Sequence, residues 1–135
     1  MVLLGRLQSW RRLLRWGAGL GVALLVSVVP VQARDRSPSF VTVALADLPA
    51  EAARVHKQVL AGEPFASPKD GVVFGNRERR LPTEPRGFYR EYTVPTPGAR
   101  DRGARRLVCG GRQVSAPEAC WFTGDHYQSF QRIKP

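Results

Sequence analysis

The chain has few of the residues that build metal centres and thiol active sites. Its 135 residues include two cysteines and two histidines, and no pair of ligand residues accompanies either cysteine. This scarcity argues against a zinc-type site. The sequence also has no internal repeat and no low-complexity tract, which excludes a repeat array.

Acidic residues are absent from the first 33 positions, and so is any long hydrophobic run. The uncharged stretch from Gly17 to Val29 is shorter than the roughly 18 to 20 apolar residues of a membrane-spanning helix. It follows four arginines and precedes Val31-Gln32-Ala33, a small-residue cleavage pattern. We therefore expect residues 1–33 to be a signal peptide, with a retained anchor as the alternative. The mature protein would be secreted, extracellular or periplasmic, without stable membrane association.

Positive charge dominates the remaining chain. Residues 34–135 contain 17 basic and 11 acidic residues, a net charge of +6. A basic exported domain attracts polyanions such as nucleic acid or an anionic envelope, although many basic exported proteins bind nothing in particular. A chain of this length builds one domain with a small core.

The two cysteines, Cys109 and Cys120, are most simply a disulfide in an exported protein. They bracket a segment with Gly-Gly and Pro117 and no apolar periodicity, so the bridge would close a surface loop between two strands. A catalytic or metal-binding thiol is the alternative.

The pattern along the chain predicts a helix followed by strands. Residues 34–46 form a leader and a first short strand, and a helix starts at Asp47-Leu48-Pro49 and stops at Gly62. This order favours an α+β fold with the helix packed on one face of an antiparallel sheet. Strand-like segments lie near residues 71–74, 88–94, 104–109, 119–122 and 128–133.

A carboxylate, two arginines and a histidine stand out among the last 45 residues: Glu91, Arg102, Arg106 and His126. On alternating strand positions Arg102, Ala104, Arg106 and Val108 share one face, so the two guanidiniums can converge on one anion. The alternatives are solvated arginines on an edge strand and a solvated histidine in a turn. Glu91, in a segment fit for a sheet, needs positive partners to stay ionised.

Four motifs in order resemble the microbial guanyl-specific ribonuclease family, which contains barnase, and most closely its short extracellular branch of the ribonuclease Sa type. The resemblance implies a guanyl-specific ribonuclease domain at residues 47–135, with the microbial ribonuclease fold and a monomeric state. The motifs are F-x-N-R-E from Phe74, Y-x-E-Y-T-V from Tyr89, P-G-A-R-x-R-G-x-R-R from Pro97 and T-G-D-H-Y from Thr123.

The resemblance also implies roles for the catalytic residues. Glu91 matches the general base that removes the proton of the ribose 2′-hydroxyl, and His126 matches the general acid that protonates the departing 5′-oxygen. Arg102 and Arg106 match arginines that neutralise the phosphoryl oxygens, and Tyr127 matches a phosphate-contacting tyrosine. No metal or other cofactor is then required. DNA lacks the 2′-hydroxyl, so the expected substrate is single-stranded RNA.

Guanine selectivity is expected from residues 74–78. By resemblance, Glu78 accepts hydrogen bonds from guanine N1 and N2, and the Asn76 and Arg77 main chain supplies N–H groups to O6. Phe74 packs against or near the base. Without the resemblance, residues 74–78 would indicate only a turn after a strand, with Glu78 and its neighbouring arginines as solvated charges. Gly75 departs from relatives that often carry a larger polar residue there, which puts the rigidity of the loop in question.

Three functions fit this reading. The first is a secreted endoribonuclease that cleaves after guanosine, forming and then hydrolysing a 2′,3′-cyclic phosphate. The second is a catalytically quiet RNA-binding module of the same fold, and the third is a toxin with the same active site. The family also implies a barstar-like intracellular inhibitor that protects the producing cell.

Overall fold

The computed structural model describes residues 38–134. The predicted signal peptide at residues 1–33 and the first part of the predicted leader lie outside this range. Within it, no helix is long and apolar enough to cross a membrane.

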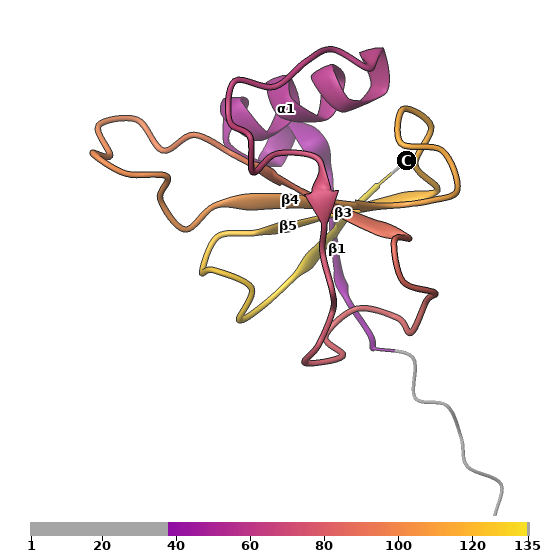
Figure 1. The fold of residues 1–135 in the computed structure, drawn as a ribbon. Coiled ribbons are helices and arrows are strands. Elements are labelled where there is room, and N and C mark those ends of the chain that lie inside the picture. Colours follow the sequence, from indigo (N-terminus) through magenta and orange to yellow (C-terminus); the bar gives the residue numbers. More distant parts are fainter. Residues whose placement is uncertain (1–37, 135) are drawn as a thin grey trace, which may run out of the picture. The chain divides into compact units, whose positions relative to one another are not determined.

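One helix and a six-stranded sheet organise the described residues (Figure 1). The α+β prediction is confirmed, and every predicted strand-like segment contains a strand. The elements are β1 (Val41–Val43), the 3₁₀ turn η1 (Leu45–Asp47), α1 (Ala50–Ala61), β2 (Val72–Val73), β3 (Tyr89–Thr93), β4 (Arg106–Gly110), β5 (Ala119–Thr123) and β6 (Gln131–Ile133).

Helix α1 follows the apolar spacing of its sequence. Ala52, Val55 and Val59 are buried against the sheet, as expected for one face of an amphipathic helix. The helix begins after Pro49, slightly later than predicted, because Asp47 belongs to the preceding 3₁₀ turn. It stops at Gly62 as predicted, where a left-handed backbone (φ 64°) lets the Gly62 N–H close the last turn.

The strand order β1-β6-β5-β4-β3-β2 makes the sheet mixed rather than antiparallel. Strand β1 pairs in parallel with β6, in a register that sets Thr42 opposite Arg132, whereas the other pairs are antiparallel. The prediction of a wholly antiparallel sheet is therefore wrong at this edge. A parallel pair needs a long connection, which the chain between residues 43 and 131 supplies.

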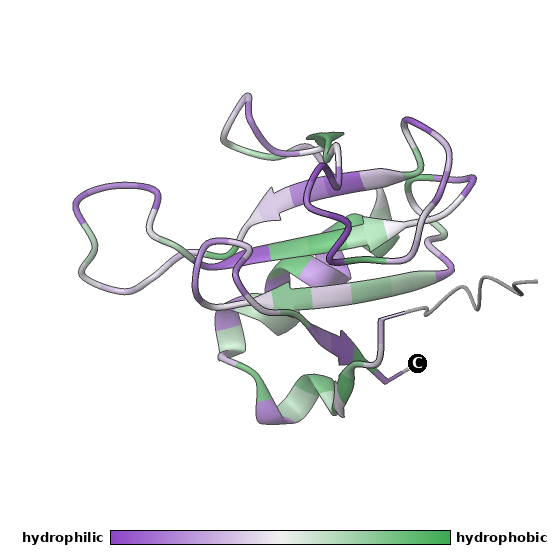
Figure 2. Cartoon of the chain, turned by 90° about the horizontal axis from the view of Figure 1, so that it is seen from below, coloured by the Kyte–Doolittle hydropathy of each residue, from purple (hydrophilic) through white to green (hydrophobic). Residues whose placement is uncertain are grey.

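Both faces of the sheet are covered. On the α1 face, Tyr92, Leu107 and Phe122 join the helix residues in one core cluster. On the opposite face, Tyr89, Val108 and Trp121 form a second cluster, rich in aromatic rings. Figure 2 shows hydrophobic segments in the central strands and mostly hydrophilic loops around them.

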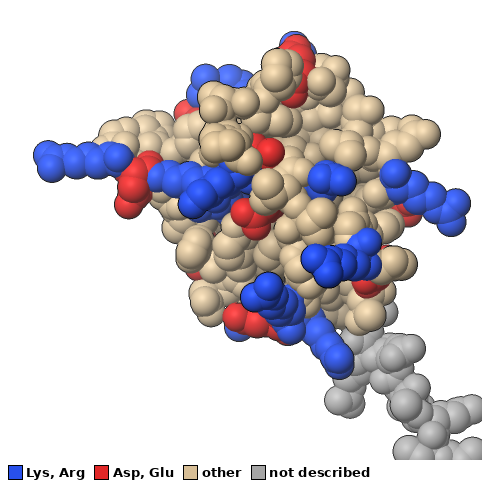
Figure 3. Space-filling model, in the orientation of Figure 1, with Lys and Arg blue, Asp and Glu red and all other residues tan. Residues whose placement is uncertain are grey.

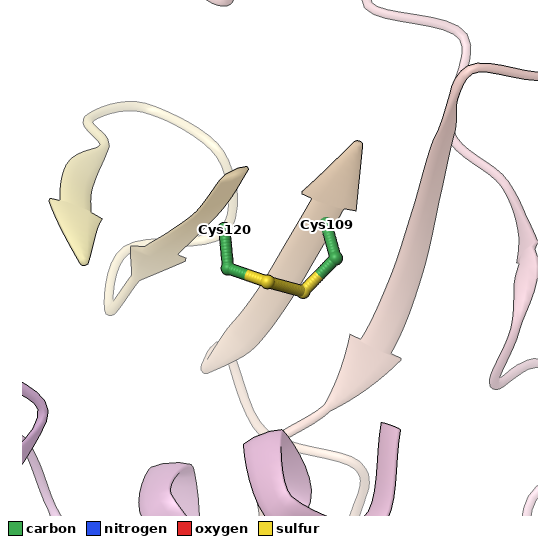
Figure 4. The surroundings of a disulfide bond; sticks show 2 residues. All are labelled: Cys109 and Cys120. Atoms are coloured by element: carbon green, nitrogen blue, oxygen red, sulfur yellow. A yellow bond between two sulfur atoms is a disulfide. The ribbon is translucent and has the colours of Figure 1, made fainter. Parts of the chain in front are cut away.

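The disulfide between Cys109 and Cys120 is present and joins opposed residues of β4 and β5 (Figure 4). Both cysteines are buried in the core cluster on the α1 face. The bridge therefore closes the loop between two strands, as predicted, and lies on the opposite face from Val108.

Strand β4 begins at Arg106, so the prediction that Arg102 lies on this strand is wrong. Arg106 and Val108 do share a face, but residues 95–105 form a loop. Gly103 has φ 63°, and a Cβ there would lie 2.9 Å from Thr96 Oγ1. Because this turn requires glycine, strand alternation cannot extend from Arg106 back to Arg102.

Loss of the disulfide should lower stability measurably. For a loop of this length, chain entropy predicts that the double variant Cys109→Ala, Cys120→Ala has a free energy of unfolding about 3 kcal/mol lower than that of the parent. Urea denaturation measures the difference, and the parent under reducing conditions should match the variant. Equal unfolding midpoints for oxidised parent and variant would contradict the prediction.

Candidate active site

The register of the central strands brings the carboxylate and one arginine to the same face of the sheet. Glu91 pairs with Val108, and Thr93 pairs with Arg106. Opposed residues of an antiparallel pair, and residues two apart on one strand, point to the same side. Glu91, Thr93 and Arg106 therefore share the face of the aromatic cluster, away from α1.

Glu91 is held among polar partners. Its side chain is only 16% exposed, and its Oε2 accepts a 2.9 Å hydrogen bond from the Tyr127 hydroxyl. Its Oε1 lies 3.8 Å from Arg102 Nη1. Burial, followed by the hydrogen bond and negative charge of Glu91, raises the pKa of Tyr127, and nearby Arg106 acts in the opposite direction. Tyr127 therefore stays a protonated donor to this carboxylate.

Arg106 is a buried cation that the protein neutralises only partly. The residue is 3% exposed, and its Nη1 donates to the carbonyl oxygens of Gly103 (2.8 Å) and Arg105 (2.7 Å). Among residues 38–134, no carboxylate lies within ion-pair distance of it, and its buried Nε has no hydrogen-bond partner. A buried donor without a partner is costly, so this guanidinium is suited to an anionic ligand.

Arg102 reaches the same region from the 95–105 loop. Its Nη1 is the nitrogen closest to Glu91, whereas its Nε and Nη2 bond to Thr93 and Asp70. Arg102 thus approaches the carboxylate from a loop, whereas Arg106 lies on the same face of the sheet from strand β4.

His126 lies on an exposed turn between β5 and β6. His126 and Tyr127 both have left-handed backbone, with φ 56° and 70°, and the His126 N–H donates to the Ala104 carbonyl at 3.1 Å. The two rings are 5.0 Å apart. Because the Tyr127 hydroxyl contacts Glu91, this turn places the imidazole at the rim of the region that contains the carboxylate.

Asp125 builds this turn rather than pairing with His126. Its carboxylate accepts hydrogen bonds from the Thr123 hydroxyl and from the Ser129 hydroxyl and N–H. The Ser129 bonds are the largest of the effects that lower the pKa of Asp125 to about 2. A carboxylate thus fixes the loop that presents His126.

The predicted base-recognition residues line one cleft of about 640 Å³, together with Tyr127. The Asn76 side chain is turned into its own loop, where it bonds the Leu81 N–H and the carbonyls of Leu81 and Pro82. Within the described chain, the N–H groups of Asn76 and Arg77 bond to no other residue. The Phe74 ring stacks on Tyr127 at 5.2 Å, so the cleft adjoins Glu91.

Glu78, at the mouth of this cleft, is paired with an arginine. Its exposed carboxylate accepts a 2.9 Å bond from Arg80 Nε, and Arg80 Nη1 donates to the Gln128 carbonyl at 2.7 Å. Arg80 therefore ties the base-recognition loop to the loop that carries His126.

Sequence reasoning missed Asp70 and Thr93, and it expected Arg80 only to add positive charge around the groove. Alternation along β3 places Thr93 on the face of Glu91, so that residue could have been found. The side-chain partners of Asp70 and the Gln128 partner of Arg80 lie 23 or more positions away, and local pattern gives no sign of such contacts. Figure 3 shows basic side chains at several places on the visible face, with carboxylates beside several of them.

No group of three or more histidine, cysteine or carboxylate residues in the described range is arranged to hold a metal ion. The side chains that this arrangement does bring together are a carboxylate, an imidazole, a phenol and two guanidiniums.

A family model described as ribonuclease matches residues 31–134. The chain is 48% identical over 92 residues to guanyl-specific ribonuclease Sa from Kitasatospora aureofaciens, covering 68% of this chain and 92% of the relative. It is 47% identical over 93 residues to guanyl-specific ribonuclease St from Saccharopolyspora erythraea, covering 68% and 86%.

Solved structures of ribonucleases are also similar to this chain. A structure of ribonuclease Sa2 in complexes with mononucleotides superposes with a TM-score of 0.67 at 40% identity, covering 73% of this chain and 98% of that one. Ribonuclease Sa2 with guanosine-2′-cyclophosphate superposes with a TM-score of 0.64 at 40% identity, covering 72% and 98%.

Acid should weaken the turn that Asp125 builds. The Asp125 carboxyl titrates at about 2 in the folded chain, below its ordinary 3.8. Its stabilisation is therefore fully present above about pH 4 and is lost as the pH falls toward 2. We expect Asp125→Asn to lower the free energy of unfolding at pH 7, and this difference to shrink toward pH 2.

Urea denaturation of parent and variant across this pH range measures the effect. Ser129→Ala, which removes one of the Asp125 partners, should show a smaller loss with the same dependence on pH. A difference between parent and Asp125→Asn that stays constant from pH 7 to 2 would rule out the linkage.

Proposed function

We infer that this chain, which belongs to the ribonuclease family, is a guanyl-specific endoribonuclease. The observation that carries this inference is a single grouping: Glu91 bonded to Tyr127 and facing Arg102, with the buried Arg106 on the same face. The cleft of residues 74–78 adjoins this grouping through Tyr127. The relatives named guanyl-specific ribonucleases support the same conclusion.

In the proposed reaction, one side chain acts as the general base and another as the general acid. Glu91 takes the proton of the ribose 2′-hydroxyl, and the 2′-oxygen forms a bond to the adjacent phosphorus. The bond from phosphorus to the 5′-oxygen breaks, and His126 protonates that oxygen. In the second step the roles reverse, and water opens the 2′,3′-cyclic phosphate to a 3′-phosphate.

The arginines and the tyrosine stabilise the charge that develops on the phosphoryl oxygens. Arg106 is suited to this role because its buried guanidinium faces no carboxylate in the described chain. In a site sheltered from water, prearranged cations stabilise a transition state more than they would in solvent. The single hydroxyl proton of Tyr127 is donated to Glu91 in the structure. It turns to a phosphoryl oxygen when Glu91 takes the proton of the 2′-hydroxyl and no longer needs this donor.

Guanine is recognised by the loop that begins at Phe74. Glu78 accepts the N1 and N2 hydrogens, and the N–H groups of Asn76 and Arg77 reach O6. A carboxylate has about four acceptor positions, so the bond from Arg80 leaves capacity for the base. Adenine presents a donor where guanine has O6, and it would leave the loop N–H groups without partners.

We also propose that the enzyme is exported, secreted or periplasmic, and acts on single-stranded RNA as a monomer. The buried disulfide supports an oxidising compartment, and a single chain supplies every residue of the proposed site. Because such a site would cleave the RNA of its own cell, we further propose a barstar-like intracellular inhibitor.

Removal of the base or the acid should abolish most of the activity. On the dinucleotide GpC without added metal, Glu91→Ala and His126→Ala should each lower kcat/KM by about 100- to 10,000-fold. His56→Gln, which changes the other histidine, is the matched control and should cleave like the parent. Equal rates for parent, Glu91→Ala and His126→Ala would refute the catalytic assignment.

Base selectivity should depend on Glu78. The change Glu78→Gln removes a charged acceptor and should lower kcat/KM for GpC by about 10- to 100-fold, with little effect on ApC. Glu84→Gln changes another carboxylate of the same cleft and should leave the ratio of GpC to ApC rates unchanged. If Glu78→Gln kept the parental ratio, the role of this carboxylate would be disproved.

A further inference from the structure

Asp70 is a buried carboxylate that contacts the candidate active site from outside it. It lies between α1 and β2, and its side chain is 7% exposed. Its Oδ1 accepts three hydrogen bonds: from the Thr93 N–H at 2.7 Å, from the Thr93 hydroxyl at 2.6 Å and from Arg102 Nη2 at 3.1 Å. Such a carboxylate is committed to the protein and is not available to substrate.

These bonds fix one edge of the Arg102 guanidinium. Thr93 Oγ1, which donates to Asp70, accepts a 2.5 Å bond from Arg102 Nε. The Lys69 carbonyl accepts a second bond from Nη2 at 3.3 Å. Because the guanidinium is planar and rigid, holding Nε and Nη2 also sets the direction of Nη1. That nitrogen lies 3.8 Å from Glu91 Oε1.

Placing a buried carboxylate next to this site has a cost in free energy that a neutral side chain would not have. Asp70 places a second negative charge close to a site that would bind a phosphodiester, and its charge is removed from water. It offsets this cost by pairing with an arginine on a loop. Without Asp70 and Thr93, the long Arg102 side chain would be free to adopt other rotamers.

We propose that Asp70, acting with Thr93, is a positioning residue that holds Arg102 in place for the reacting phosphate. This inference rests on the proposed ribonuclease function. Asp70 contacts neither Glu91 nor the cleft-lining residues 74–78 in any hydrogen bond of the described chain, so its influence on the reaction passes through Arg102.

A double-mutant cycle with Asp70→Asn and Arg102→Ala tests this pathway. Asp70→Asn removes the charge but preserves the shape, and kcat on GpC should fall about 10-fold, the effect of losing one charge-assisted hydrogen bond. Arg102→Ala should lower kcat on GpC by about 100- to 1,000-fold. In the Arg102→Ala background, Asp70→Asn should cause no further loss, because the residue through which it acts is gone.

Thr93 provides a second arm that does not depend on the Asp70 variant folding. Thr93→Val lacks the hydroxyl at similar shape and should lose activity like Asp70→Asn, whereas Thr93→Ser should restore most of it. Asp101→Asn is the matched control, because among residues 38–134 the Asp101 side chain accepts a bond from the Gly103 N–H alone, in the same loop; the kcat of this variant should stay parental. All rates are measured well below each variant's unfolding temperature.

The outcomes separate the two claims. Equal losses from Asp70→Asn with and without Arg102 would mean that Asp70 acts only on the fold, and would overturn the positioning role. Parental kcat for both Asp70→Asn and Thr93→Val would also overturn it. If Arg102→Ala itself cleaved GpC as fast as the parent, the proposed role of Arg102 in the reaction would fail, and the positioning role with it.

Discussion

The site depends on how two guanidinium groups are neutralised at the edge of an otherwise apolar sheet face. Arg102 is shared between two carboxylates, Asp70 and Glu91, so its position is set by the protein. Arg106 is buried and bonded mainly to backbone carbonyls, so its charge is balanced only in part. One arginine is therefore held in place and the other keeps an incompletely balanced charge, and under the proposed function the two together would define where a phosphate is stabilised.

The two faces of the sheet differ in what they contain: one holds the core that packs against the helix, and the other leads to the candidate active site. The α1 face contains the core cluster that packs against the helix, together with the disulfide, and neither needs access to solvent. The opposite face is covered by aromatic residues and opens at its edge toward Glu91 and Tyr127. Because neighbouring residues on β3 and β4 alternate between these faces, the same strands that stabilise the domain also align the reactive groups.

Much of this arrangement was predictable from local sequence. The helix stop at Gly62, the strand positions and the pairing of Cys109 with Cys120 follow from short-range patterns, and the family resemblance is confirmed by the relatives. The parallel β1–β6 pair was not predictable, because it joins the two ends of the described chain. Asp70 was missed for the same reason, since its partners are separated from it by 23 and 32 positions.

The shape of the loop predicted to bind guanine depends on Asn76 and not on Gly75, the residue before it. A Cβ at Gly75 would meet only the Arg77 side chain, at 3.6 Å, so the loop does not require glycine there. Its shape comes from Asn76, whose left-handed backbone and three side-chain hydrogen bonds join both ends of the turn. Since Arg80 donates a hydrogen bond to the Gln128 carbonyl, the loop predicted to bind guanine and the turn that carries His126 are joined directly.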